Sequence, residues 1–197
     1  MTVVSYSCEA QRIDDLFGIV RLNPVLMQIL HILQRLDLPD WRVVSGAIYQ
    51  TVWNSLTQRP YDYGIKDYDI AYYNKQDMSY EAEDHVIRQV ISSLPISISQ
   101  HIEVRNQARV HLWYESKFGS PYPALANTDE SLLRYLSPAH AVAIRMEKDG
   151  SLTVAAPFGL SDLFSLIVRA NPHCVTNQHF AKKAEALKSR WPEITIL

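Results

Sequence analysis

The chain has 197 residues, of which 47% are hydrophobic and 20% are charged. This length allows one domain with a substantial hydrophobic core, and the composition excludes an intrinsically disordered chain. The formal net charge of -2 gives no overall attraction to a phosphate backbone or anionic lipid, so nucleic acid is not a favoured partner.

Helical periodicity dominates the first part of the chain. Residues 13–20 are amphipathic, and Asn23 followed by proline is typical of a helix start. Apolar residues at three- and four-residue spacing then predict a helix over residues 24–36. The aromatic and β-branched segment 41–44 predicts a short strand that ends at a turn formed by Ser45-Gly46.

The middle of the chain alternates between helical and extended patterns. Residues 47–56 return to helical spacing, residues 65–73 read as a strand, and residues 77–94 have the pattern of an amphipathic helix. Residues 96–104 suggest another extended segment. Periodicity alone leaves residues 105–114 open between helix and strand.

The sequence pattern in the last part of the chain predicts short helices and strands. A capping pattern at residues 128–131 starts a short helix, and an Asp-Gly turn joins strands 140–146 and 152–155 into a hairpin. Two further helices are expected at residues 162–168 and 177–190.

Two aspartates carry the most informative chemistry. Asp67 and Asp69 are two residues apart on the expected strand, so their carboxylates project to the same face. Like charges this close repel each other unless a cation neutralises them, and oxygen ligands favour Mg²⁺ or Mn²⁺. Phosphoryl and nucleotidyl transfer require such a metal. The alternative is a solvent-facing pair without a ligand, since turns and strands supply many Asp-x-Asp sequences.

Neighbouring residues add candidates for the same site. Ser45 and Gly46 stand between a strand and a helix, where backbone N–H groups can hold phosphate. Glu103 alternates with apolar neighbours and is the candidate third metal ligand, its alternative being a solvated strand glutamate. Arg109 is a candidate for triphosphate binding, its alternative being a structural ion pair. Lys66 is expected to point to the opposite face.

The order of these residues resembles the nucleotidyltransferase superfamily typified by DNA polymerase beta. Its pattern is a small-residue turn, a strand with two acids between hydrophobic residues, and a further acid on a later strand. More closely, the chain looks like a bacterial family of nucleotidyltransferase-like proteins, with matches from about Trp41 to Trp191 at SGAIYQTVW, IKDYDIAYY, EVRNQARVHLWY and APFGLSDLF.

The resemblance implies a fold and an activity. We expect an α/β (α+β) fold in which a small mixed sheet is flanked by helices. Residues 1–197 form one domain, with the nucleotidyltransferase core at about 40–115, helices before it, and a hairpin plus helices after it. The implied reaction transfers a nucleoside monophosphate from a nucleoside triphosphate to an unknown acceptor hydroxyl, using two Mg²⁺ ions, or Mn²⁺.

The implied roles fall on the residues already singled out. Asp67, Asp69 and Glu103 bind the metal ions, Glu103 also orients or deprotonates the acceptor, and Ser45, Gly46 and Arg109 bind the nucleotide. The Ser-Gly order of the turn and the long connection to Asp67 keep two alternatives open. One is a nucleotide-binding or interaction module without catalysis, and the other is a structural protein with solvated carboxylates.

Cysteine usage and the absence of targeting features suggest a compartment. Cys8 and Cys174 form no CxxC pair, so we expect free thiols in a reducing environment. The N-terminus lacks a signal-peptide pattern, and no run approaches the roughly 20 apolar residues that span a bilayer. We expect a cytoplasmic protein with no membrane partner.

Overall fold

The computed structural model describes residues 8–173 and 177–197. The α-helices are α1 (Glu9–Arg21), α2 (Pro24–Leu36), α3 (Gly46–Leu56), α4 (Tyr80–Ser92), α5 (Ile96–Ser99), α6 (Tyr114–Phe118), α7 (Ser161–Phe164) and α8 (Asn177–Arg190). The strands are β1 (Arg42–Val44), β2 (Tyr68–Tyr72), β3 (Ile102–Asn106), β4 (Ala143–Met146), β5 (Leu152–Ala155), β6 (Ile167–Val168) and β7 (Thr195–Ile196). The 3-10 helices are η1 (Gln107–Leu112), η2 (Asp129–Arg134) and η3 (Pro138–His140).

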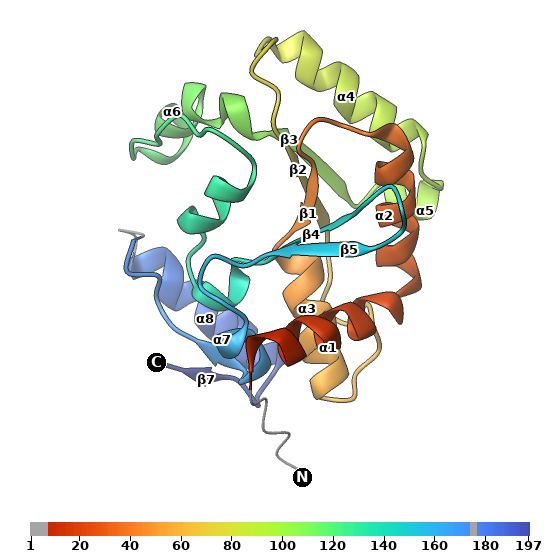
Figure 1. The fold of residues 1–197 in the computed structure, drawn as a ribbon. Helices are drawn as coiled ribbons and strands as arrows, with labels where there is room; N and C mark the ends of the chain where they lie inside the picture. The colour runs from red at the N-terminus through yellow and green to blue at the C-terminus, as the bar shows by residue number, and fades with distance from the viewer. Residues whose placement is uncertain (1–7, 174–176) are drawn as a thin grey trace.

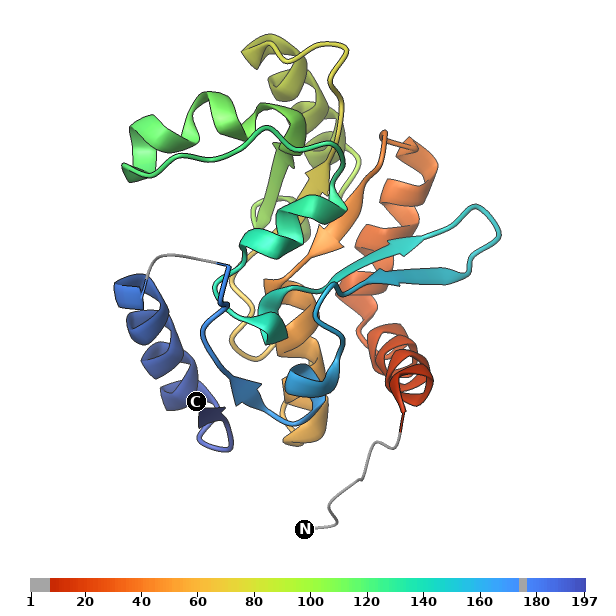
Figure 2. The ribbon, with the colours of Figure 1, turned by 60° about the vertical axis from the view of Figure 1, so that its left-hand side comes forward.

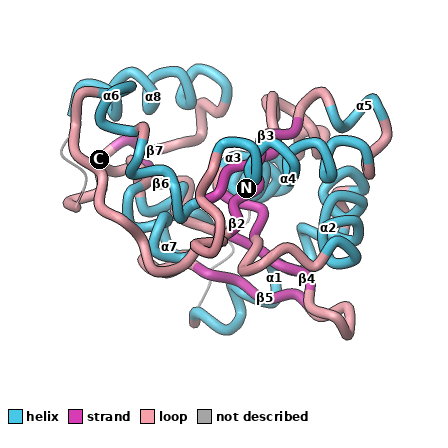
Figure 3. Tube along the Cα trace, turned by 90° about the horizontal axis from the view of Figure 1, so that it is seen from above, coloured by secondary structure: helices cyan, strands magenta, loops and turns pink. Residues whose placement is uncertain are grey.

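A five-stranded mixed sheet lies at the centre of the molecule (Figure 1). The strand order is β3-β2-β1-β4-β5, with β2 and β3 parallel and the other neighbours antiparallel. Strands β6 and β7 form a separate parallel pair. Figure 3 shows the five-stranded sheet between α2 and α5 on one side and α6 and α8 on the other. The predicted fold class, a small mixed sheet flanked by helices, is confirmed.

One face of the sheet supplies the main hydrophobic core. Val43 lies opposite both Ile70 and Ile144, and Ile70 also lies opposite Val104, so these side chains share a face. All four are buried in one cluster whose members run from Leu16 on α1 to residues after α8. The helices before and after the sheet therefore share a core with it.

The other face of the sheet is covered by residues 107–136, which we call the covering segment. Val44, Ala71 and Ala143 on this face pack with Leu132 of η2 in a smaller buried cluster. In Figure 2 the covering segment, coloured green to teal, leaves the sheet after β3 and returns to β4. The covering segment therefore lies against the sheet face that carries Val44, Ala71 and Ala143.

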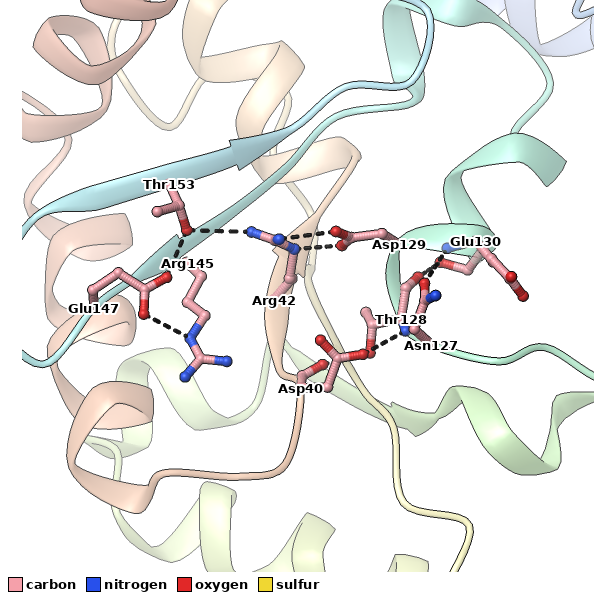
Figure 4. Close-up of polar contacts among 10 residues, drawn as sticks. Asp40, Arg42, Asn127, Thr128, Asp129, Glu130, Arg145, Glu147 and Thr153 are labelled. Carbon is pink, nitrogen blue, oxygen red and sulfur yellow. Dashed lines mark hydrogen bonds and ion pairs between the residues drawn. The ribbon is translucent and has the colours of Figure 1, made fainter.

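Polar contacts fix the covering segment to β1, as Figure 4 shows. The Arg42 Nη2 atom lies 2.9 Å from Asp129 Oδ2, and Arg42 Nε also donates to Asp129 Oδ1. The backbone N–H of Thr128 donates to Asp40 Oδ2 at 2.7 Å. A bidentate arginine–carboxylate pair holds its partners in a defined orientation, so η2 has a defined position over the sheet.

Several local predictions are confirmed. Helix α2 covers the expected residues 24–36, and the Asn23 side chain accepts a hydrogen bond from the Leu26 N–H at 3.1 Å. Strands β4 and β5 form the expected antiparallel hairpin. Both features follow from local chemistry, a capping side chain in one case and an Asp-Gly turn in the other.

Other local predictions are wrong. Residues 96–104 are not one extended segment, because the short helix α5 precedes β3 and buries Ile98 in the core. The helix expected over residues 162–168 ends at Phe164, and Ile167–Val168 pair with β7 instead. A parallel partner from the end of the chain decides that pairing, and no local pattern reveals it.

The first two helices also bear on the membrane question. Among the described residues, no single helix is long and apolar enough to cross a membrane. Only α1 and α2 together meet the length and composition for a span, and they are bent by 97°. Cys8 is an exposed free thiol, whereas Cys174 lies outside the described residues.

Candidate active site

The sheet brings Asp69 to the covered face. Tyr68, Ile70 and Tyr72 are buried on β2, and this burial turns the intervening Asp69 to the other side of the strand. Asp69 lies opposite Val44 of β1 and opposite Glu103 of β3. Its side of the sheet is thus the side that carries the covering segment.

Asp67 lies just before β2 rather than on it, which corrects the expectation that both aspartates share the strand. The ladder begins at Tyr68, whose N–H donates to the His101 carbonyl at 2.8 Å. Both aspartates are nevertheless partly buried and line the same cavity. Strand alternation does not extend to the residues before Tyr68, and Lys66 therefore lines this cavity too, contrary to the prediction of an opposite face.

This cavity, which we call the carboxylate cavity, has a volume of about 280 Å³. Its walls come from the start of α3, from the approach to β2, from the end of the covering segment and from α8. The lining residues are Ser45, Gly46, Tyr49, Gln50, Gly64, Lys66, Asp67, Asp69, Tyr135, Lys183 and Arg190. The structure thus brings the predicted Ser45, Gly46, Asp67 and Asp69 together.

The turn at Ser45 starts a helix at the cavity wall. Ser45 has a positive φ of 54°, and its carbonyl accepts hydrogen bonds from the N–H groups of Ile48 and Tyr49 at 2.9 and 3.0 Å. The first backbone N–H groups of a helix have no partner within the helix, and they carry the positive end of its dipole. A side chain added at Gly46 would lie 3.3 Å from Gln50 Nε2, so glycine leaves room for a ligand to approach this turn.

The surroundings of the carboxylate cavity disfavour the ionised form of Asp69. Burial, together with the charges of Asp67 and Glu103, raises the pKa of Asp69 to about 6. Burial also raises the pKa of Tyr135, and the charge of Asp69 is the next cause. A bound cation would relieve this repulsion. Two carboxylates are the hard oxygen donors that Mg²⁺ prefers, so the donor set fits a divalent metal.

Cations from α8 line the same cavity as the carboxylates. Lys183 lines the cavity, where desolvation lowers its pKa and the charges of Asp69 and Asp67 oppose that change. Arg190 lies seven residues later on α8 and donates from Nη1 to the Gly64 carbonyl at 3.0 Å. Gly64 has a φ of 75° and lies so close to Trp191 that a side chain would not fit.

Glu103 lies beside the cavity rather than in its lining. It is in register with Asp69, and its charge raises the pKa of that residue. Its side chain is 54% exposed, with Oε2 at 3.6 Å from Arg105 Nη2. Over residues 8–173 and 177–197, no three histidine, cysteine or acidic side chains are grouped so that they could hold a metal ion. The role of Glu103 as a third ligand stays a prediction.

Arg109 does not reach the cavity, which corrects its prediction as a nucleotide-binding residue. Its Nη1 atom pairs with the buried Glu83 of α4, and its Nε donates to the Met78 carbonyl at 3.2 Å. Glu83 also accepts the Asn106 N–H at 2.8 Å. Arg109 is needed there because a buried carboxylate without a partner is costly, so the structural ion pair is the observed arrangement.

Several residues of the cavity come from distant segments and were not predicted from the sequence. Lys183, Arg190 and Tyr135 line the cavity because α8 and the covering segment both reach it. Seven-residue spacing on a helix places Lys183 and Arg190 on one face, and this was the only local signal. Gln50 was missed as well. Its Oε1 atom is buried without a hydrogen bond among the described residues, which leaves an acceptor for a ligand.

Comparisons with known proteins agree with this arrangement. A family model described as nucleotidyltransferase matches residues 31–196. A structure solved by NMR, described as revealing a CCA-adding enzyme head domain, has a similar fold with a TM-score of 0.73. The two share 20% sequence identity over 93% of this chain and 95% of the other, so the likeness concerns the fold. No curated protein sequence matches the chain.

Proposed function

This chain belongs to a nucleotidyltransferase family, as its four sequence motifs predicted, and we propose that it transfers a nucleoside monophosphate from a nucleoside triphosphate to an acceptor hydroxyl. One observation carries the proposal. The start of α3, the carboxylates Asp67 and Asp69, and the cations of α8 line one cavity. These are the groups that a triphosphate with a bound metal requires.

In this proposal Asp67 and Asp69 hold Mg²⁺, with Mn²⁺ as the alternative. When bound, the metal supplies positive charge to the phosphate oxygens and to the leaving group. The raised pKa of Asp69 supports the assignment, because burial and then the charges of Asp67 and Glu103 disfavour the ionised carboxylate, and a bound cation would favour it. The protein's own contribution is to hold the two carboxylates close together, one on β2 and one at its start.

The triphosphate is held by backbone and by cations. The first backbone N–H groups of α3, beside Ser45 and Gly46, form the positive end of that helix, where anions are stabilised. Lys183 and Arg190 line the same cavity. These two cations take the role first predicted for Arg109, whose guanidinium is occupied by Glu83.

The proposed reaction is a substitution at the α-phosphorus. The acceptor oxygen forms a bond to the α-phosphorus while the bond from that phosphorus to the bridging α–β oxygen breaks. Pyrophosphate leaves with the bonding electrons, and the hydroxyl proton passes to a base. We propose Glu103 as that base, because it lies in register with Asp69 and its carboxylate is open to an approaching acceptor.

A second candidate function is a nucleotide-binding module without turnover. The observation that favours it is the position of Glu103, which pairs with Arg105 and lies outside the cavity lining. Such a module would bind a triphosphate without releasing pyrophosphate.

A screen of the four nucleoside triphosphates with magnesium tests the proposal, with melting temperature and pyrophosphate release measured together. We expect Asp69→Ala to abolish magnesium-dependent triphosphate binding in calorimetry while the fold stays intact. The matched control is Asp14→Ala, an exposed carboxylate on α1. Unchanged triphosphate binding by Asp69→Ala would reject the assignment, and binding without pyrophosphate release would favour the module.

A further inference from the structure

A second cavity lies beside the carboxylate cavity and has no part in the reaction proposed above. It has a volume of about 230 Å³, and we call it the aromatic cavity. The side chains that determine its chemistry are Arg105, Trp113, Tyr114, Tyr122, Arg134 and Tyr135. Tyr135 lines both cavities, so the aromatic cavity adjoins the carboxylate cavity.

The aromatic wall is built by the covering segment. The rings of Tyr114 and Tyr122 have centroids 4.6 Å apart, and those of Trp113 and Tyr114 are 6.2 Å apart. These side chains are only partly buried, so part of each one remains exposed where it lines the cavity. Aromatic rings that line a cavity in this way are suited to stacking on a flat ring of a ligand.

Two arginines make the same cavity attractive to an anion. Arg105 comes from β3, two residues after Glu103, and Arg134 comes from the end of η2. Guanidinium groups bind phosphate with paired hydrogen bonds. The Arg42–Asp129 pair fixes η2 on the sheet and thereby holds Arg134 near the strand that carries Arg105.

The cations of the two cavities form separate groups. Lys66, Lys183 and Arg190 line the carboxylate cavity, whereas Arg105 and Arg134 line the aromatic cavity. A nucleoside triphosphate has one phosphate chain and needs one of these groups. The second group therefore suits a second anionic molecule, and the only other reactant in nucleotidyl transfer is the acceptor.

We propose that the aromatic cavity binds the acceptor, and that this acceptor is a single nucleoside monophosphate or a molecule with the same two parts, a flat aromatic ring and a phosphate. The inference rests on the proposed function. The cavity volume of about 230 Å³ gives room for one nucleotide at most, which favours a single nucleotide over a longer chain. A hydroxyl of the bound acceptor forms the new bond to the α-phosphorus, pyrophosphate leaves, and the proton passes to Glu103.

Titration with the four nucleoside 5′-monophosphates by calorimetry, without magnesium, tests the site. We expect at least one to bind, and Arg134→Gln to raise its Kd by about ten-fold, because a charged hydrogen bond is lost. Arg88→Gln is the matched control, since Arg88 pairs with Asp84 on α4 and does not line the cavity. If Arg134→Gln does not fold, Arg105→Gln takes its place. Binding by none of the four, or an unchanged Kd in the folded variant, overturns the proposal.

Fragments of the ligand test its chemical class. Adenosine has the ring without the phosphate, and ribose 5-phosphate has the phosphate without the ring. We expect each to bind about ten-fold more weakly than the monophosphate or worse. Equal binding of ribose 5-phosphate overturns the role of the aromatic wall. Tighter binding of a short single-stranded oligonucleotide overturns the single-nucleotide class.

The same titration in Asp69→Ala separates this inference from the proposed function. Monophosphate binding that survives in this variant, while triphosphate binding is lost, supports two separate sites. Competition of triphosphate and monophosphate for one site overturns the inference and leaves the proposed function standing. Intact monophosphate binding without pyrophosphate release in the wild type overturns the proposed function alone.

Discussion

Asp69 on β2 and Glu103 on β3 lie directly opposite each other in the parallel strand pair at one edge of the sheet. Glu103 is open to solvent, whereas Asp69 lines the carboxylate cavity. The two carboxylates therefore stand side by side in different surroundings. Because of this difference, metal binding is proposed for Asp69 and the role of general base for Glu103.

We expect Glu103→Gln to retain triphosphate binding and to lose transfer. A general base contributes about 10²- to 10⁴-fold to a rate, so the pyrophosphate release rate should fall by about that factor. Calorimetry and a pyrophosphate assay on the same sample measure the two effects. Equal loss of affinity and rate would show instead that Glu103 is a ligand of the nucleotide complex.

The stability of the metal-free protein should depend on pH through Asp69. Its pKa is about 6 in the folded protein and has a reference value of 3.8, so the native state binds more protons than the unfolded state between about pH 4 and pH 6. The contribution of this group to stability therefore falls as pH rises through that window. We expect Asp69→Asn to be more stable than the wild type above pH 6, by about 1–2 kcal/mol, and equally stable near pH 4.

Urea unfolding of both proteins in the presence of a chelator measures this difference. Equal stabilities at pH 7 would contradict the raised pKa of Asp69. With magnesium added, the wild type should gain stability at pH 7 and Asp69→Asn should gain less, because a ligand that binds the folded state stabilises it.

Lys183→Gln should weaken triphosphate binding. Removing one charged contact to phosphate costs about 1.5–3 kcal/mol, which corresponds to a Kd higher by about ten-fold or more. Lys182→Gln is the matched control, because Lys182 is exposed on the same helix and does not line the cavity. Similar Kd values for the two variants would remove Lys183 from the site.

Gly64→Ala should destabilise the protein by more than Gly150→Ala. Both glycines have positive φ, 75° and 83°, and strain of this kind costs about 1–3 kcal/mol. A methyl group at Gly64 would also meet Trp191 Cη2 at 2.7 Å, whereas nothing lies within 4 Å at Gly150. The difference between the two variants in urea unfolding measures the contact with Trp191. Equal losses would mean that Trp191 moves aside.

Arg109→Met should destabilise the fold without changing triphosphate affinity. The substitution leaves Glu83 buried at 6% exposure without its guanidinium partner, a change that costs about 3–5 kcal/mol. Adding Glu83→Gln should recover part of that loss, since an amide oxygen can still accept the Asn106 N–H. A raised triphosphate Kd in the folded fraction would restore Arg109 to the nucleotide site.

The amino-acid sequence by itself was sufficient for the elements whose causes are local. The cap at Asn23 and the hairpin from β4 to β5 both follow from residues a few positions apart. The alternation of buried residues on β2 also set the face on which Asp69 lies. Spacing along a strand or helix determines the direction in which a side chain projects, and this direction can be predicted without knowing which other segments pack against it.

Only the tertiary structure decided which charged groups share a cavity. Lys183 and Tyr135 line the same cavity as the carboxylates because α8 and the covering segment both reach it, while Arg109 in η1 pairs with Glu83 of α4. Each of these placements depends on contacts between segments far apart in the chain. The free energy of burying or pairing a charge is set by such contacts, and local periodicity carries no information about them.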